Sequence, residues 1–135
     1  EASEPDKGIT DQEFDPVVTV NQVKDWGIVY AGKYTIEHPM ICALNTNLGH
    51  LPPILIQASH EEVLRDDALR LHDKILMDGG DSELHMYEGL LHVWHLFWKY
   101  VPESQEAIDR MANFLKKAFK RQGSEFPQAE VKKAS

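Results

Sequence analysis

The sequence predicts an α/β fold in which helices cover parallel strands. Two short apolar runs are typical of buried strands, and each is followed by a segment with helical periodicity. The composition, 42% hydrophobic and 27% charged, is that of an ordinary globular domain. Alternation of strand and helix is expected when helices pack on a parallel sheet, so the 135 residues suit one domain or part of one.

Residues 1–16 are predicted to form an exposed acidic loop. Acidic side chains outnumber apolar ones here, so the segment cannot bury enough surface to offset the entropy lost on ordering. Residues 17–31 fit an amphipathic helix loosely, with Gly32 as a stop signal. Residues 33–50 mix Pro, Asn and Gly with scattered apolar side chains, which indicates an irregular connection.

The first strand is predicted over residues 51–57. Two prolines can open a strand, and the Ile-Leu-Ile run that follows them indicates a fully buried, central one. A helix over residues 62–78 comes next, because its apolar side chains recur at helical spacing. Ser59 and Glu62 have the spacing of a capping box at its start, and Gly79 and Gly80 would end it.

A second strand is predicted over residues 84–87, and a glycine-containing turn and an aromatic-rich segment, residues 93–100, follow it. Residues 102–120 form a closing amphipathic helix. The folded part is therefore placed at residues 17–122, with a flexible tail over residues 123–135. Two strands alone would expose unpaired backbone groups at both edges, so we expect neighbouring strands from another stretch of protein.

The charge, the apolar runs and the cysteine count each limit the partners and location that are expected. With 22 acidic residues against 14 Lys and Arg, the net charge of −8 would repel a phosphate backbone, so nucleic acid is not expected as a partner. No apolar run approaches the roughly 20 residues that span a bilayer, so no membrane association is expected either. Cys42 is the single cysteine, which excludes an intrachain disulfide and makes a cytoplasmic location the default expectation.

Two ordered motifs give the sequence a resemblance to a known family. Residues 51–71, which begin Leu-Pro-Pro and continue through Glu-Glu-Val-Leu-Arg-Asp-Asp, are similar to the acid-bearing segment of hormone-sensitive-lipase-like carboxylesterases. Residues 87–94, Tyr-Glu-Gly-Leu-Leu-His-Val-Trp, resemble their histidine turn, and residues 15–19 resemble the segment before the preceding helix. The resemblance implies the C-terminal portion of an α/β-hydrolase fold, its last parallel strands with flanking helices.

The resemblance also implies roles for single residues. His92 would be the triad histidine, which accepts a proton from a serine hydroxyl and returns it to the leaving alcohol. Glu61 would be the triad acid, in a position where the family usually has aspartate, since these triads admit either residue. Glu62 and Asp66 are the alternative acids. A purely structural interpretation is that Glu61 and Glu62 complement a helix N-terminus.

The nucleophile of this chemistry is absent from the sequence. Neither a Gly-x-Ser-x-Gly elbow nor a His-Gly-Gly oxyanion loop occurs, and Gly80-Asp81-Ser82 lacks the closing glycine and joins a helix to a strand. We therefore expect an N-terminal part of the same hydrolase to supply the serine, and this chain to be inactive alone. The resemblance further implies a small ester substrate, no cofactor and homodimer contacts near the last strand.

The sequence also offers a metal site and a partner surface as alternatives to the esterase. His92, His95 and His85 could suggest zinc, but the turn glycine before His92 and the lack of a clear third ligand disfavour a metal site. The aromatic side chains after His92 favour packing over a dedicated partner surface. The remaining alternative to an enzyme is a binding or regulatory domain that kept the hydrolase fold and lost its chemistry.

Overall fold

The computed structural model describes residues 15–121 and 123. The predictions for an acidic loop before residue 15 and for a tail after residue 123 therefore lie outside the described residues. Helices and strands alternate along the chain, with two short 3₁₀ segments between them. The elements are α1 (Val20–Ala31), η1 (Ala43–Asn45), β1 (Ile54–Ser59), α2 (Arg65–Met77), β2 (Ser82–Tyr87), η2 (Trp94–Phe97) and α3 (Pro102–Arg121).

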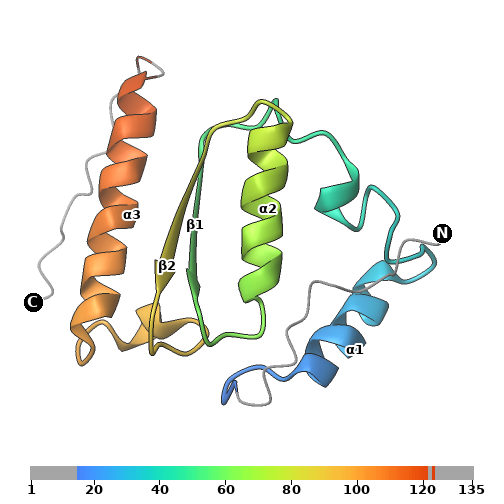
Figure 1. Ribbon diagram of the computed structural model, residues 1–135, viewed down its shortest axis with the longest axis horizontal. Coiled ribbons are helices and arrows are strands. Elements are labelled where there is room, and N and C mark those ends of the chain that lie inside the picture. The colour runs from blue at the N-terminus through green and yellow to red at the C-terminus, as the bar shows by residue number, and fades with distance from the viewer. Residues whose placement is uncertain (1–14, 122, 124–135) are drawn as a thin grey trace, which may run out of the picture.

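Strands β1 and β2 lie side by side and parallel, with Ile54 opposite Ser82 and Ser59 opposite Tyr87. Figure 1 shows the two strands nearly edge-on, with α2 on one face of the pair and α3 on the other. This is the layered arrangement that strand–helix alternation requires. The predicted α/β class, with parallel strands and flanking helices, is confirmed.

The core lies between these layers. Ala58 of β1, Val63 after it and Ile75 of α2 are almost completely buried on the α2 side. Trp94 of η2 is also buried, and α3 buries Ser104 and Ala107. The turn between α2 and β2 is also tight, because a Cβ added to Gly80 would lie 2.7 Å from a methyl carbon of Ile75.

The capping predicted for α2 does not form. The helix begins at Arg65, its N-cap is Leu64, and no side chain caps it. Ser59 is still part of β1, and its hydroxyl binds the carboxylate of Glu61 instead. Among the described helices, α1 has a capping box, in which Thr19 and Gln22 satisfy each other's backbone N–H groups. Gly32 follows α1 with φ of 57°, which confirms the predicted stop.

The strand predicted to be fully buried is only half-buried. The apolar run of β1, residues 54–56, is of intermediate exposure along its length. Within the described residues the sheet has two strands, so neighbours that would cover a central strand are not among them. Large apolar side chains are also exposed on α1, among them Trp26, Ile28 and Val29. No helix in the described part of the chain is both long and apolar enough to cross a membrane.

The prediction of an exposed loop over residues 1–16 is wrong at Asp15, whereas Pro16 is exposed as predicted. The side chain of Asp15 is buried, with 8% of the residue exposed. The carboxylate accepts hydrogen bonds from the backbone N–H groups of Val17, Val18 and Val63. Burial of a carboxylate is tolerated when donors of this kind replace its water. The composition of residues 1–16 could not indicate this, because one of these donors is 48 residues away.

Candidate active site

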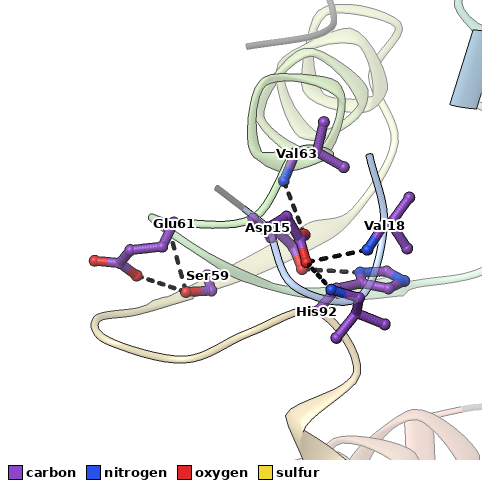
Figure 2. Close-up of polar contacts among 8 residues, drawn as sticks. Asp15, Val18, Ser59, Glu61, Val63 and His92 are labelled. Atoms are coloured by element: carbon purple, nitrogen blue, oxygen red, sulfur yellow. Dashed lines mark hydrogen bonds and ion pairs between the residues drawn. The ribbon is translucent and has the colours of Figure 1, made fainter. Parts of the chain in front are cut away.

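The two parallel strands end at the same edge of the sheet, and each is followed by a turn that carries polar side chains. Residues 60–64 connect β1 to α2, and residues 88–93 connect β2 to η2. The backbone N–H of His60 donates to the carbonyl of Tyr87, so the two turns start side by side. Figure 2 shows Val63 of the first turn and His92 of the second beside Asp15, which belongs to the segment before α1, whereas Glu61 points away from them.

The central contact of this site joins Glu62 and His92. Oε2 of Glu62 lies 3.0 Å from Nδ1 of His92, although the residues are 30 positions apart. The Glu62 side chain is almost buried, at 6% exposed, whereas His92 keeps 27% of its side-chain surface. A buried carboxylate on Nδ1 orients an imidazole and fixes its tautomer, so that the other ring nitrogen, Nε2, can exchange protons.

The surroundings of Glu62 act on its charge in opposite directions. Burial raises the pKa of Glu62 above its ordinary value, because the charged form loses water. The hydrogen bond and the charge of His92 oppose this rise, while the negative charge of Asp15 adds to it. The hydrogen bond to the imidazole is therefore the largest of the effects that favour the charged carboxylate.

Glu61, the residue predicted to contact the histidine, points elsewhere. Its exposed carboxylate accepts hydrogen bonds from the Ser59 hydroxyl at 2.7 Å and from the Gly89 N–H at 2.8 Å. The Ser59 bond is the main reason that the pKa of Glu61 is lowered, and Gly89 adds to the effect. The prediction that Glu61 lies against His92 is wrong, because successive side chains of this turn point in different directions and only that of Glu62 turns inward.

Asp66, the other alternative acid, also lies outside the contact between Glu62 and His92. Asp66 is in the first turn of α2, where one of its oxygens is 2.8 Å from the guanidinium Nε of Arg65. Of Glu61, Glu62 and Asp66, Glu62 is thus the one in hydrogen-bond contact with His92. Glu61 has a different place, because it joins the end of β1 to the start of the histidine turn.

The turn that carries His92 is held in an unusual backbone conformation. Gly89 has φ of 69°, and Val93, the residue after the histidine, has φ of 55° in the left-handed region. A β-branched residue rarely adopts this conformation, so the surrounding packing must hold it there. Trp94 contributes to that packing, since its side chain is buried and its carbonyl accepts a 2.7 Å hydrogen bond from the Ser104 hydroxyl.

His95 is part of a separate contact between η2 and the sheet. Its Nε2 lies 2.9 Å from Oε1 of Gln57, and Nε2 of Gln57 donates to the carbonyl of Ala107 in α3. The imidazole also stacks on Trp94, with ring centroids 4.2 Å apart. Burial, and secondarily the charge of His92, lowers the pKa of His95. The described residues contain no group of three metal-ligating side chains that could hold an ion.

An apolar pocket of about 260 Å³ adjoins the histidine turn. It is lined by Gly89, Leu90, Leu91, Trp94, Phe97 and Val101. Three of its lining residues, Gly89 to Leu91, belong to the turn that carries His92, although His92 itself does not line the pocket. Concave apolar surfaces beside a few polar groups are typical of small-molecule sites.

Asp15 is the residue of this site that the sequence did not indicate. Its carboxylate binds the N–H of Val63, the neighbour of Glu62, in the turn over residues 60–64, here called the acid turn. Asp15 itself belongs to the segment before α1. In the sequence, the resemblance to the family is what marks the Asp-Pro-Val-Val-Thr segment, residues 15–19. An aspartate often binds the backbone N–H groups two and three residues later, as Asp15 does with Val17 and Val18. This local pattern is the signal in the sequence that could have indicated a structural role for Asp15.

Comparisons with known proteins identify the family of this fold. The profile of the α/β hydrolase fold matches residues 2–96. An acetyl-hydrolase of Streptomyces hygroscopicus is 37% identical over 82 residues, which are 61% of this chain and 27% of the relative. A solved esterase from the bacterial hormone-sensitive lipase family is 34% identical with a TM-score of 0.73, over 77% of this chain and 35% of that one. The esterase EstE5, soaked with p-nitrophenyl butyrate, is 36% identical with a TM-score of 0.64, over 67% and 31%.

These matches cover most of the present chain but only a part of each relative. The chain spans about a quarter of the acetyl-hydrolase and about a third of the two solved esterases. The matched region contains the two parallel strands, and residues 87–94 and 51–71 carry the motifs from which the resemblance was inferred. The resemblance is confirmed: this chain belongs to the α/β hydrolases of the hormone-sensitive-lipase-like family.

Proposed function

We propose that this chain supplies the histidine and the acid of a serine carboxylesterase, with His92 as the proton carrier and Glu62 as the acid. The observation that carries the proposal is the 3.0 Å contact between Glu62 and Nδ1 of His92 at the ends of two parallel strands. The chain is related to proteins named as esterases and acetyl-hydrolases, and the esterases are named for the hydrolysis of esters. Glu62 replaces Glu61 in this role because of its contact with the imidazole.

The reaction follows from the two ends of the imidazole. Nε2 of His92 takes the proton of a serine hydroxyl while the serine oxygen attacks the ester carbonyl carbon. Glu62 accepts the hydrogen bond from Nδ1–H and stabilises the imidazolium that forms. His92 then returns the proton to the leaving alcohol, and an acyl-enzyme remains. Water repeats the sequence on the acyl carbonyl, which releases the acid and restores the serine.

The serine and the oxyanion donors come, in this proposal, from an N-terminal part of the same hydrolase. The sequence itself has no Gly-x-Ser-x-Gly elbow, and the chain spans 27% of its acetyl-hydrolase relative. The half-buried apolar residues of β1 and the exposed apolar side chains of α1 provide surface that such a part can cover. By itself the chain is proposed to lack esterase activity, because no acyl-enzyme can form without the nucleophile.

The substrate is proposed to be a small ester with an apolar acyl or alcohol group. The pocket beside the histidine turn offers apolar lining and about 260 Å³, enough for a short chain. EstE5, which shares the fold, was soaked with p-nitrophenyl butyrate. A butyrate ester with a chromogenic alcohol is therefore the substrate of choice for a first assay. Neither hydrolysis step requires a cofactor.

The test is hydrolysis of p-nitrophenyl butyrate by the protein that contains both parts. We expect turnover in the intact protein, no turnover by residues 1–135 alone, and loss of at least about a thousandfold in kcat for His92→Ala. The control is His38→Ala, which removes an imidazole outside the two turns of the site. His38 lies in the connection between α1 and β1, and its Nδ1 accepts a local hydrogen bond from the Met40 N–H. Wild-type turnover in the His92 variant would exclude the proposal.

A further inference from the structure

Asp15 is a buried carboxylate that the reaction above does not use. It is 8% exposed, and both of its oxygens have backbone donors. Oδ1 accepts from Val17 N–H at 2.8 Å and from Val18 N–H at 3.2 Å, which closes a local turn before α1. Oδ2 accepts from Val63 N–H at 3.3 Å, in a segment 48 residues later. Oδ1 therefore binds the local turn, and Oδ2 binds the distant turn that contains Val63.

We infer that Asp15 is a positioning residue for Glu62, which holds the acid turn so that the Glu62 carboxylate faces His92. The inference rests on the proposed function, since it concerns the acid of that triad. Its physical basis is that the N–H of Val63 belongs to the peptide unit that joins Val63 to Glu62. A planar peptide fixed at its N–H restricts the backbone dihedral on the Glu62 side, and with it the direction of the Glu62 side chain.

The rest of the turn shows why such a tie is needed. Glu62 precedes the first residue of α2 by three positions, and α2 has no side-chain cap that would order its first turn. Val63 is fully buried, and its N–H bond to Asp15 attaches this uncapped turn to the segment before α1 (Figure 2). On the other side of the turn, Glu61 is tied to Ser59 and Gly89. Glu62 is thus held from both of its neighbours.

The charge of Asp15 cannot be the reason for its presence beside the acid. Its negative charge raises the pKa of Glu62, which disfavours the ionised form that must stabilise an imidazolium. A neutral residue at position 15 would remove this cost. Removal of the charge alone should favour the ionised form of Glu62 and should not reduce activity. A loss of activity in a neutral Asp15 variant would therefore come from the lost hydrogen bond to Val63 and not from the lost charge.

Two variants separate the local turn from the distant contact. Asp15→Ser keeps a side-chain oxygen that can bind the N–H groups of Val17 and Val18, but it is too short and has no second oxygen for Val63. Asp15→Asn keeps the size and one acceptor oxygen. The matched control is Asp78→Asn, because Asp78 also accepts from a distant backbone N–H, that of Leu48, and pairs with Lys74. It follows the last residue of α2, about 20 Å along the helix from its start.

The readouts are kcat and KM for p-nitrophenyl butyrate in the protein containing both parts, and the ¹⁵N NMR signals of the His92 ring in the same protein. We expect both Asp15 variants to lower kcat about tenfold with KM within about twofold, and to lower the fraction of His92 with its proton on Nδ1. Asp78→Asn should reduce the free energy of unfolding and leave both readouts unchanged. Restoring aspartate at position 15 restores both.

The results that would overturn the role of Asp15 differ from those that would overturn the proposed esterase function. Folded Asp15 variants with wild-type kcat and wild-type ring signals would overturn the inference, even if Glu62→Gln abolishes turnover. Failure of both Asp15 variants to fold would also overturn it, because the role would then be structural alone. If His92→Ala retains turnover, the esterase proposal falls, and the ring signals of His92 still decide whether Asp15 positions Glu62.

Discussion

Nδ1 of His92 lies 3.0 Å from the buried carboxylate of Glu62, while the adjacent Glu61 carboxylate binds the Ser59 hydroxyl and the Gly89 N–H. The two neighbouring glutamates thus make separate contacts. In the proposed reaction, Glu62 orients the imidazole and stabilises its charged form. Glu61 joins the end of β1 to the histidine turn, and its pKa is lowered by the donors that hold it. Variants of the two residues should therefore differ in kind.

In the protein that contains both parts, Glu62→Gln should lower kcat for p-nitrophenyl butyrate by at least about a hundredfold, because a neutral amide cannot stabilise the imidazolium. Glu61→Gln should lower it by less than about tenfold, because an amide oxygen can still accept from Ser59 or Gly89. Steady-state kinetics of the two variants measure the difference. Equal losses, or a larger loss for Glu61→Gln, would contradict the assignment of the acid.

Glu61→Gln should instead change how stability depends on pH. The folded pKa of Glu61 is lowered from 4.5, so the unfolded chain binds a proton at a pH where the folded chain does not. The stabilisation is therefore complete above the unfolded value and is lost as pH falls through the folded value. The effect should be small, because the side chain is exposed and solvent screens it.

Urea unfolding between pH 7 and pH 3 measures this dependence. We expect the wild type to be more stable than Glu61→Gln at neutral pH, with the difference shrinking below about pH 4.5. Glu88→Gln is the control, because Glu88 is an exposed glutamate of the neighbouring turn, residues 88–93. A difference that grows on acidification would have the wrong sign for a lowered pKa.

His95 should make the protein sensitive to mild acid. Its pKa is lowered by burial, so below about pH 6.5 the unfolded chain takes up a proton that the folded chain resists. Stability supplied by the neutral ring is present above that pH and falls as the solution is acidified. His95→Gln should flatten the decline between pH 7 and pH 5, which urea unfolding at three pH values would show. A slope unchanged from the wild type would refute it, and His38→Gln controls for loss of an imidazole elsewhere.

Replacement of Val93 by a residue that is not β-branched should stabilise the folded chain. Its left-handed φ of 55° is costly for a β-branched side chain, whereas asparagine adopts it readily. We expect Val93→Asn to raise the free energy of unfolding by about 1 kcal/mol, measured by urea titration. Val29→Asn, in the exposed helical backbone of α1, should change it by less than about 0.5 kcal/mol. A destabilised Val93 variant would show that side-chain packing outweighs the backbone cost.

The sequence by itself determined the order of the elements, the class of the fold and the turn that carries His92. These follow from local signals, since helical periodicity, short apolar runs and turn glycines act within a few residues. The starts of the helices were less exact, because α2 begins three residues after the predicted position once Ser59 remains in β1. The acid-bearing turn was also found, through the resemblance of residues 51–71.

Only the tertiary structure decided which carboxylate meets the imidazole. Glu61 and Glu62 lie in an irregular turn, where side-chain direction follows no period, so a shift of one residue exchanges the exposed and the buried glutamate. The burial of Asp15 was equally hidden, because one of its donors, Val63, comes from a distant segment. Directions at a turn are set by contacts between segments far apart in the chain, and spacing within one segment does not encode them.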